Sequence, residues 1–534
     1  MKIAFYGAAH EVTGSCTVLY ANGKTIMIDC GLEQGPDIYE NCELPILPSS
    51  IDCVLLTHAH IDHSGKLPFL TAGGFGGKIY ATEATEKLCG IMLLDSAYIQ
   101  EYEAKWKNRK AKRSGQESFT PLYTVKDAEK TLKQFVSCSY DKEYTLFDGI
   151  TVSFTDAGHL LGSSSVSICI NENGKEETIV FSGDLGNVKR PLIRDPRSPK
   201  KADYAVIEST YGDRTHPPVK DYVKQMAAII QSTLDRGGNL VIPCFAVGRT
   251  QEMLYLIRTI KEQGLIKRHD GFPVYVDSPL AVEATEIYGS DLNDYFDEEA
   301  LELLSRGINP IKFKDLILSV SAEESVAINK DKTPKIILSA SGMCEAGRIR
   351  HHLKHNLWRR ESTVLFVGYQ ADGTLGRLIL DGACRIKLFG EDIQVNAKIE
   401  RLDGVSGHAD RNMLIDWLKG FEQAPKTVFV NHGQDSVCDS FADDITKTLG
   451  ITSYAPYNGA EFDTETCEFS DVGNTTRIVK TVQKNTKRQS TAYPQLQNAI
   501  NRLTAIAEGY RNGANKDIAR LTSQINSLCE KWDK

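Results

Sequence analysis

The stretch that decides the fold is Cys53-Val54-Leu55-Leu56-Thr57-His58-Ala59-His60-Ile61-Asp62-His63-Ser64-Gly65. Its apolar, branched first part predicts a buried strand that ends at Thr57. Three imidazoles and one carboxylate follow within six residues. Neutral imidazole binds zinc, iron or copper, and a mixture of nitrogen and oxygen ligands suits hydrolytic zinc. A polar turn with surface histidines is the alternative, but it leaves so many ligands on one short loop unexplained.

The spacing of these four side chains divides them into two pairs. His58 and His60 alternate, so both can face one ion, whereas Asp62 and His63 are adjacent and can turn towards a second ion. Upstream, Asp29 closes another predicted strand just before Gly31. A carboxylate in that place can orient a metal-ligating histidine, although a turn-capping aspartate is an equal alternative.

Length and composition limit the class of protein. A chain of 534 residues is too long for one ordinary core, so we expect two or three domains. The net charge of -8 means that any nucleic-acid contact must come from local patches. The 13 cysteines are scattered without a C-x-x-C pair, which indicates free thiols in a reducing compartment. With no signal peptide or membrane-spanning run in sight, we expect a cytoplasmic protein without a membrane partner.

Two later strand ends carry further candidate ligands. His159 lies in a small-residue loop after the predicted strand at residues 150–154, and Asp184 follows the strand at residues 177–181, with glycines on both sides. A lone histidine in a loop is usually structural. An aspartate at a strand end can place its carboxylate between two cations, which in hydrolytic sites lie roughly 3.5–4 Å apart.

The ordered set His58-x-His60-x-Asp62-His63, His159 and Asp184 resembles the metallo-β-lactamase fold. The resemblance implies a β-sandwich with helices on both outer faces. It also implies two zinc ions, with manganese as an alternative metal. One zinc would take His58, His60 and His159, the other would take Asp62 and His63, and Asp184 would bridge them.

Three further segments resemble the extra motifs of the β-CASP branch, whose members process nucleic acids: residues 204–212, 404–410 and 428–434. The resemblance implies that His408 protonates the leaving group, that Glu208 supports it, and that Asp62 and Asp184 belong to the catalytic centre. His432 would complete the second metal site. Histidine at that position accompanies RNA-directed members of the family, whereas valine marks the DNA-repair group, so the resemblance favours single-stranded RNA as the substrate.

Residues 243–252, 276–281, 339–343 and 368–377 resemble the inserted β-CASP domain. Their pattern of strand, small-residue loop and helix predicts an α/β domain with a parallel sheet. Such loops point backbone N–H groups at phosphates, so we predict RNA phosphate contacts at Arg249, Ser339, Ser341 and Gly342. Ordinary α/β loops remain the alternative.

A basic run at residues 105–113 contains Trp106 and follows a predicted helix at residues 82–100. A solvated helix face is the preferred interpretation, and a phosphate-binding surface is the alternative.

Near the C-terminus, a polar, basic linker at residues 477–488 precedes two apolar stripes at residues 496–510 and 518–532. Their three- and four-residue steps predict an αα-hairpin that packs either on the chain's own core or on a second copy in a homodimer.

The predicted fold class is therefore α/β: an αββα metallo-β-lactamase sandwich with an inserted α/β β-CASP domain and a short helical tail. The predicted bounds are 1–209 and 386–465 for the sandwich, 210–385 for the insert, and 466–534 for the linker and tail.

The predicted function is a zinc-dependent ribonuclease, acting as an endonuclease, a 5′-exonuclease or both. A DNA-directed nuclease is one alternative. A small-molecule hydrolase would not need the insert, and a silent RNA-binding subunit would usually have lost metal ligands, whereas here every motif position is filled.

Overall fold

The computed structural model describes residues 1–35, 46–114, 118–217, 221–402 and 404–478, and towards the C-terminus residues 500, 503–504, 506–507, 509–511 and 514–532. The chain forms two compact units, Met1–Ile478 and Val479–Lys534. The first unit contains all the predicted site residues.

Two sheets form the sandwich of the first unit. The first sheet has eight strands among the described residues, in the order β23 (Glu468–Val472), β22 (Ala460–Asp463), β1 (Lys2–Gly7), β2 (Cys16–Ala21), β3 (Lys24–Ile28), β4 (Cys53–Leu55), β5 (Lys78–Thr82) and β6 (Phe135–Cys138). The second has seven, in the order β21 (Thr452–Tyr454), β20 (Thr427–Asn431), β11 (Tyr204–Glu208), β10 (Lys175–Phe181), β9 (Ser164–Glu172), β8 (Ile150–Asp156) and β7 (Glu143–Phe147).

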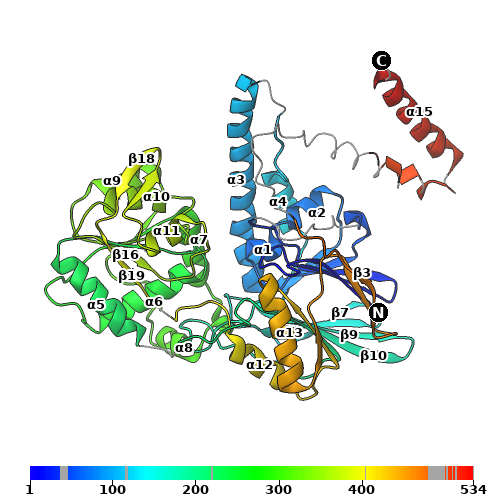
Figure 1. Ribbon diagram of the computed structural model, residues 1–534, viewed down its shortest axis with the longest axis horizontal. Helices are drawn as coiled ribbons and strands as arrows, with labels where there is room; N and C mark the ends of the chain where they lie inside the picture. Colours follow the sequence, from blue (N-terminus) through cyan, green and yellow to red (C-terminus); the bar gives the residue numbers. More distant parts are fainter. Residues whose placement is uncertain are drawn as a thin grey trace. The chain divides into compact units, whose positions relative to one another are not determined.

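The sandwich exists because each strand sends alternate side chains to opposite faces. In β8, Ile150, Val152 and Phe154 are buried in the core between the two sheets, against residues such as Phe5 and Leu55 of the first sheet. The outer faces are covered by helices (Figure 1). Those on the first sheet are α2 (Leu67–Ala72), α3 (Glu83–Ser114) and α4 (Val125–Leu132), and those on the second are α12 (Arg411–Lys419) and α13 (Asp435–Leu449). This is the predicted αββα arrangement.

The predicted insert leaves the second sheet after β11 and returns at β20, which pairs with β11 in parallel. It contains a sheet of six strands, all paired in parallel, in the order β14 (Leu316–Ser319), β13 (Val274–Asp277), β15 (Ile336–Ser339), β12 (Leu240–Pro243), β16 (Thr363–Phe366) and β19 (Lys398–Arg401). A two-stranded ribbon, β17 (Arg385–Leu388) and β18 (Glu391–Gln394), precedes β19.

Alternation along the strands again decides which helices cover which face of this sheet. Leu240 and Ile242 point towards one core, and Val241 between them points towards the other. The first face is covered by α5 (Tyr222–Asp235), α6 (Arg249–Glu262), α7 (Pro279–Tyr288) and α8 (Glu298–Ser305). The second is covered by α9 (Ala322–Lys330), α10 (Ile349–Asn356) and α11 (Leu375–Leu380). The prediction of an α/β insert with a parallel sheet is confirmed.

The strand pairing suggests different domain bounds from those predicted. Because β19 still pairs with β16, we propose that the insert ends after Arg401 rather than at residue 385. Because β23 pairs with β22 and the Asn474 amide donates to the main-chain oxygen of Asn458, we propose that the sandwich extends to residue 478 rather than 465. A sequence pattern does not reveal which sheet a short strand joins.

Two predicted helices can be compared directly with the structure. The helix predicted at residues 82–100 is α3, which continues to Ser114 because Glu101–Lys105 and Glu103–Lys107 pairs support its second half. In the second unit, α15 (Asn515–Trp532) corresponds to the second stripe of the predicted hairpin. The first stripe and the basic linker fall largely outside the described residues. Across the part of the chain that the structure describes, no helix is both long and apolar enough to cross a bilayer.

Candidate metal centre

The candidate ligands lie at the carboxyl ends of neighbouring strands. β10, β11 and β20 run parallel, and Asp184, Glu208 and His432 lie at or just beyond the ends of these three strands. On the facing sheet, the segment after β4 carries His58 and His60 and then forms the short helix α1 (Ile61–Ser64), which carries Asp62 and His63. The carboxyl ends of parallel strands meet at one edge of a sheet, so side chains far apart in sequence converge there.

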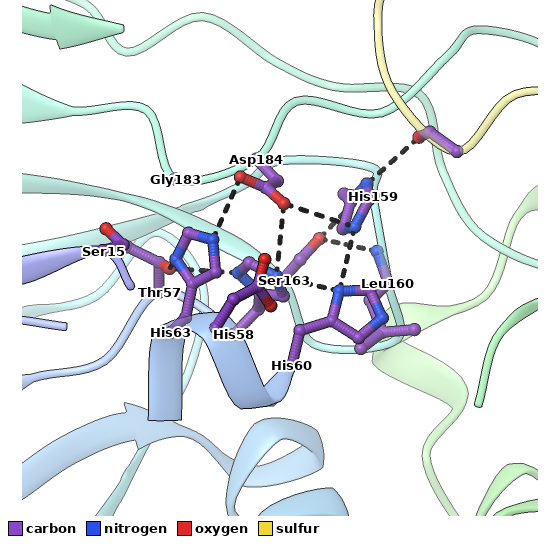
Figure 2. Close-up of polar contacts among 12 residues, drawn as sticks. Ser15, Thr57, His58, His60, His63, His159, Leu160, Ser163, Gly183 and Asp184 are labelled. Carbon is purple, nitrogen blue, oxygen red and sulfur yellow. Dashed lines mark hydrogen bonds and ion pairs between the residues drawn. The ribbon is translucent and has the colours of Figure 1, made fainter. Parts of the chain in front are cut away.

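Four side chains form the first candidate metal set: His58, His60, His159 and Asp184. Figure 2 shows His58 and His159 beside the Asp184 carboxylate, with the His60 ring beside these two rings. His60 Nδ1 lies 3.1 Å from His58 Nε2 and 3.2 Å from His159 Nε2. The Oδ2 atom of Asp184 lies 3.5 Å from His58 Nε2 and 3.6 Å from His159 Nε2. All four are at most partly exposed, and His58 is completely buried.

A second set consists of Asp62, His63 and His432, and it faces the other oxygen of Asp184. Asp184 Oδ1 lies 3.2 Å from His63 Nε2 and 3.6 Å from His432 Nδ1. His432 Nε2 lies 3.3 Å from His63 Nε2 and 3.6 Å from Asp62 Oδ2. The two oxygens of one carboxylate therefore each face a different set, which is the arrangement expected of a bridging ligand.

The hydrogen bonds around the two ligand sets leave lone pairs that can bind cations. His63 Nδ1 lies 2.7 Å from Asp29 Oδ2, and His159 Nδ1 lies 3.1 Å from the main-chain oxygen of Gly407, so each ring donates its proton outward. Their Nε2 atoms are then lone-pair acceptors pointing inward. Asp184 Oδ1 is buried and accepts no hydrogen bond from any residue that the structure describes. Lone pairs gathered in a buried place are costly unless a cation lies among them.

Asp29 contacts His63, one of the candidate ligands that we predicted it could orient. Besides its contact with His63, it accepts hydrogen bonds from the Thr57 amide (2.8 Å) and the Thr57 hydroxyl (3.0 Å). Asp29 and His432 both have left-handed backbones, with φ of 58° and 49°. Such residues cost of order 1–3 kcal/mol and are concentrated at functional sites. Gly183 (φ 57°) avoids that cost and lets Asp184 approach, since a Cβ there would lie 2.8 Å from Thr57 Cβ.

Beside the two sets, His408 and Glu208 form a pair. His408 Nδ1 lies 3.2 Å from both carboxylate oxygens of Glu208 and 3.9 Å from Asp184 Oδ2. Glu208 is held in turn by the amide of Leu185 at 2.6 Å. Burial lowers the pKa of His408, but the charge and hydrogen bond of Glu208, together with the charges of Asp184 and Asp62, outweigh burial and raise it to about 9. The ring therefore favours its charged form at the rim of the centre.

The two loops for which phosphate contacts were predicted lie side by side, and their side chains differ in exposure. Ser339 is buried, and its hydroxyl donates to the main-chain oxygen of Asp277 at 2.8 Å. The Ser339 hydroxyl therefore stabilises the sheet, and the predicted phosphate contact at this residue stays a prediction that concerns its main chain. Ser341 is partly exposed, and a Cβ on Gly342 would lie 3.2 Å from Phe245 of the other loop. Arg249 is largely buried and pairs with Glu252 through Nη1 at 2.5 Å.

Arg190, which the sequence did not single out, joins the loops that carry His159 and Gly407 to the insert. Its Nη1 donates to the main-chain oxygens of His159 (2.7 Å) and Gly407 (3.0 Å), and its Nε donates to Glu252 of α6 at 2.7 Å. Both side chains of this ion pair are nearly buried. A lone arginine in a loop gives no sequence signal, because its partners are main-chain atoms brought there by folding.

Tyr211 and His216 are two further residues that the sequence did not reveal. The Tyr211 ring lies 6.1 Å from the His408 ring and 5.1 Å from that of His216, both edge-on. His216 Nε2 lies 3.0 Å from the main-chain oxygen of His408. They support the loop that carries His408 from a segment just after β11.

Comparisons with known proteins agree with this geometry. Three family models match: the metallo-beta-lactamase superfamily over residues 11–223, the Beta-Casp domain over 250–379, and a Zn-dependent metallo-hydrolase RNA specificity domain over 392–456. The last of these contains His408 and His432, and the first contains the remaining candidate ligands.

Individual relatives match along most of their length. Ribonuclease TTHA0252 of Thermus thermophilus is 37% identical, over 82% of this chain and 94% of that protein. Transcription termination factor FttA of Methanosarcina mazei is 32% identical, over 86% and 71%. An RNase J-like protein of Methanocaldococcus jannaschii is 30% identical, over 86% and 98%. This chain belongs to the metallo-β-lactamase superfamily, in the branch that carries a β-CASP domain, and is a metal-dependent hydrolase.

Proposed function

We propose that this chain is a zinc-dependent ribonuclease that hydrolyses phosphodiester bonds in single-stranded RNA. One observation carries the proposal: two ligand sets face opposite oxygens of Asp184, and His408 faces the same carboxylate. The printed names of the relatives and the RNA specificity domain support RNA as the substrate.

Two ions per chain are proposed. His58, His60 and His159 would hold one, Asp62, His63 and His432 would hold the other, and Asp184 would bridge them. Two divalent ions so held activate a water for attack on phosphorus and stabilise charge on the phosphate oxygens. The donor set of imidazoles and carboxylates, with no thiolate, suits zinc and also admits manganese.

His408 is the proposed proton donor to the leaving ribose oxygen. Glu208 holds Nδ1 on the inner side of the ring, so Nε2 is the nitrogen that we assign to the substrate. Glu208 fixes both the orientation and the charge of the ring, much as a carboxylate does for other catalytic histidines.

The insert supplies the proposed RNA contacts. Ser341 and Gly342 lie in the loop after β15, and Arg249 begins α6 after β12. Because β12 and β15 are neighbours in a parallel sheet, both loops lie at one edge. Backbone N–H groups at such loops are natural phosphate ligands.

The test uses 5′- and 3′-end-labelled single-stranded RNA and matching DNA, with and without a chelator, resolved on a gel. We expect RNA to be cut, DNA to be spared, and the chelator to stop cleavage until zinc is restored. Internal fragments indicate an endonuclease, and mononucleotides from the 5′ end indicate an exonuclease. Cleavage of DNA alone, or cleavage that a chelator does not affect, would refute the proposal.

We also propose that the C-terminal helix supports a homodimer. α15 has apolar residues at Ile518, Leu521, Ile525 and Leu528, a spacing that places them on one face. An apolar face of this kind can be buried when it meets its copy across a two-fold axis. Light scattering of the full chain tests this, and a monomeric mass at micromolar concentration would contradict it.

A further inference from the structure

The second half of α3 carries three large aromatic residues on one face. Tyr98, Tyr102 and Trp106 follow one another at four-residue steps, and their exposed fractions are 64%, 62% and 49%. The rings of Tyr98 and Tyr102 stack with centroids 6.5 Å apart, and Lys110 lies over Trp106 with its Nζ atom 3.5 Å from the ring centroid. We call these three residues, with Lys110, the aromatic face of α3.

Among the residues that the structure describes, the three rings of this face lie outside the packed core. The opposite side of the helix is buried through Ala97, Ala104 and Ala111, spaced at seven residues. The segment after α3 covers part of the helix: the side chain of Asn108 both donates to the main-chain oxygen of Phe119 (2.9 Å) and accepts from its amide (2.6 Å). A solvated helix face usually carries small polar or charged residues, and exposed rings in a row mark an interaction site.

The charge of this part of the helix is opposite to that of the whole chain. Residues 98–113 contain six cations and only two carboxylates, in a chain whose net charge is -8. Glu101 and Glu103 pair with Lys105 and Lys107. Arg109, Lys112 and Arg113 are exposed and take no part in those two pairs. They lie on the turns of α3 that follow the aromatic residues. A row of rings beside cations is the surface that single-stranded nucleic acid prefers, because bases stack on the rings and phosphates meet the cations.

The helix begins at the catalytic loops. The hydroxyls of Thr82 (2.6 Å) and Thr85 (2.9 Å), at its start, both donate to the main-chain oxygen of Gly162, three residues after His159. With a rise of 1.5 Å per residue, Tyr98 lies roughly 20 Å along α3 from Thr85, and Trp106 about 30 Å. The helix also packs against α7 of the insert, so its base lies beside both halves of the site. Figure 1 shows α3 running from the neighbourhood of α1 past the other helices of its sheet.

We propose that the aromatic face of α3, with Arg109, Lys112 and Arg113, is a second binding surface for single-stranded RNA. It holds the part of a long substrate that extends beyond the catalytic centre. The proposal rests on the proposed ribonuclease function and adds the substrate class that the chain favours, namely RNA long enough to span the roughly 20–30 Å between the centre and the rings. RNA shorter than that span reaches the catalytic centre alone.

The experiment compares the full chain with Tyr98→Ala/Tyr102→Ala/Trp106→Ala. The matched control is Trp358→Ala, an equally exposed ring just after α10, at the edge of the insert sheet away from the loops that follow β12 and β15. Binding is measured by anisotropy with labelled single-stranded RNAs of about 6 and about 30 nucleotides, in a His408→Ala background that slows turnover. Cleavage of both RNAs is measured in the catalytically intact proteins, and circular dichroism checks the helix.

The triple variant should bind the long RNA at least ten-fold more weakly, while binding and cleavage of the short RNA stay unchanged, because stacking contributes strongly per base. The Trp358→Ala control should behave as the parent, and Trp106→Tyr should restore most of the loss from Trp106→Ala. Arg109→Gln/Lys112→Gln/Arg113→Gln should reduce the salt slope of long-RNA binding by about two, since each phosphate contact contributes roughly 0.7.

Three results would overturn the inference: unchanged long-RNA affinity in the triple variant, equal losses for short and long RNA, or unchanged RNA affinity with a reduced oligomeric mass, which would assign the face to a protein partner. Failure of the ribonuclease function itself would look different. In that case the unaltered chain would cut neither RNA.

Discussion

Nδ1 of His408 lies 3.2 Å from both carboxylate oxygens of Glu208, a residue 200 positions earlier in the chain. The distance from His408 Nδ1 to Asp184 Oδ2 is 3.9 Å, longer than the 3.2–3.6 Å contacts that Asp184 makes with His58, His63, His159 and His432. We therefore propose that His408 is a proton donor rather than a metal ligand, and the two roles should respond differently to substitution.

His408→Ala should keep the bound metal and most of the RNA affinity while lowering kcat by about 10²–10⁴, because only the protonation of the leaving oxygen is lost. Glu208→Gln should show a weaker form of the same defect. Elemental analysis and single-turnover cleavage measure the two properties separately. If His408→Ala loses metal, His408 is a ligand and the role assigned to it is wrong.

The metal content tests the two ligand sets. A zinc-replete sample should contain about two ions per chain, and Asp184→Asn should reduce the occupancy of both sites, since each carboxylate oxygen faces one set. His58→Ala should abolish activity. Asp372→Asn, at an exposed carboxylate of the insert, serves as the control. A sample that never exceeds one ion per chain, even with added zinc or manganese, rules out a two-metal centre.

Arg190 should act by positioning other groups. Arg190→Ala leaves Glu252 with one of its two arginine partners and removes the donors to His159 and Gly407, so we expect a stability loss of about 3–5 kcal/mol together with a lower kcat. Arg190→Lys keeps the charge without the forked geometry and should recover stability more than kcat. Urea unfolding and steady-state kinetics on short RNA separate these effects. Equal recovery of both would indicate a purely structural residue.

The lowered pKa of Asp277 predicts how the stability of the insert depends on pH. Burial alone would raise its pKa, but hydrogen bonds from His352, Ser325 and Arg348 outweigh burial and lower the pKa to about 2. The group therefore contributes roughly 2 kcal/mol above its unfolded pKa, and this is lost as the pH falls from about 4 towards 2. Asp277→Asn should be less stable than the parent at pH 7, and the gap should narrow in that window. Urea midpoints from pH 7 to 2.5 measure it, with Asp392→Asn at an exposed position of β18 as the control. A constant gap would contradict the assignment.

A chain that ends at residue 478 should keep its metal and cut short RNA. β23 and the ion pair between Arg477 and Asp435 both lie before that point. His432 is the last residue of the two ligand sets of the candidate metal centre. A chain that ends at residue 465 should instead lose stability, because it lacks β23. Thermal unfolding and elemental analysis of the two truncations check this. If the chain ending at 478 also loses metal, the C-terminal unit belongs to the catalytic fold.

The sequence by itself determined the ligand types and the fold class. Histidines and an aspartate crowded after an apolar strand, with His159 and Asp184 at later strand ends, allow few chemistries other than a metal centre. Strand, small-residue loop and helix, repeated in the insert, determine a parallel α/β sheet through local periodicity. The local patterns depend on neighbours within about ten residues, where spacing in sequence translates directly into spacing in space. The assignment of His159 and Asp184 to the same centre rested instead on the resemblance to a known family.

Only the tertiary structure decided which atoms face one another. Three features depend on how strands β10, β11, β20, β13 and β15 align. They are the opposite orientation of the two Asp184 oxygens, the pairing of His408 with Glu208, and the hydrogen bond from the Ser339 hydroxyl to the main-chain oxygen of Asp277. Arg190 binds main-chain oxygens, which every residue has, so no pattern of side chains announces it. Likewise, the composition of the basic run at residues 105–113 does not reveal which of its side chains face the solvent. Packing of Ala97, Ala104 and Ala111 decides that Tyr98, Tyr102 and Trp106 face the solvent.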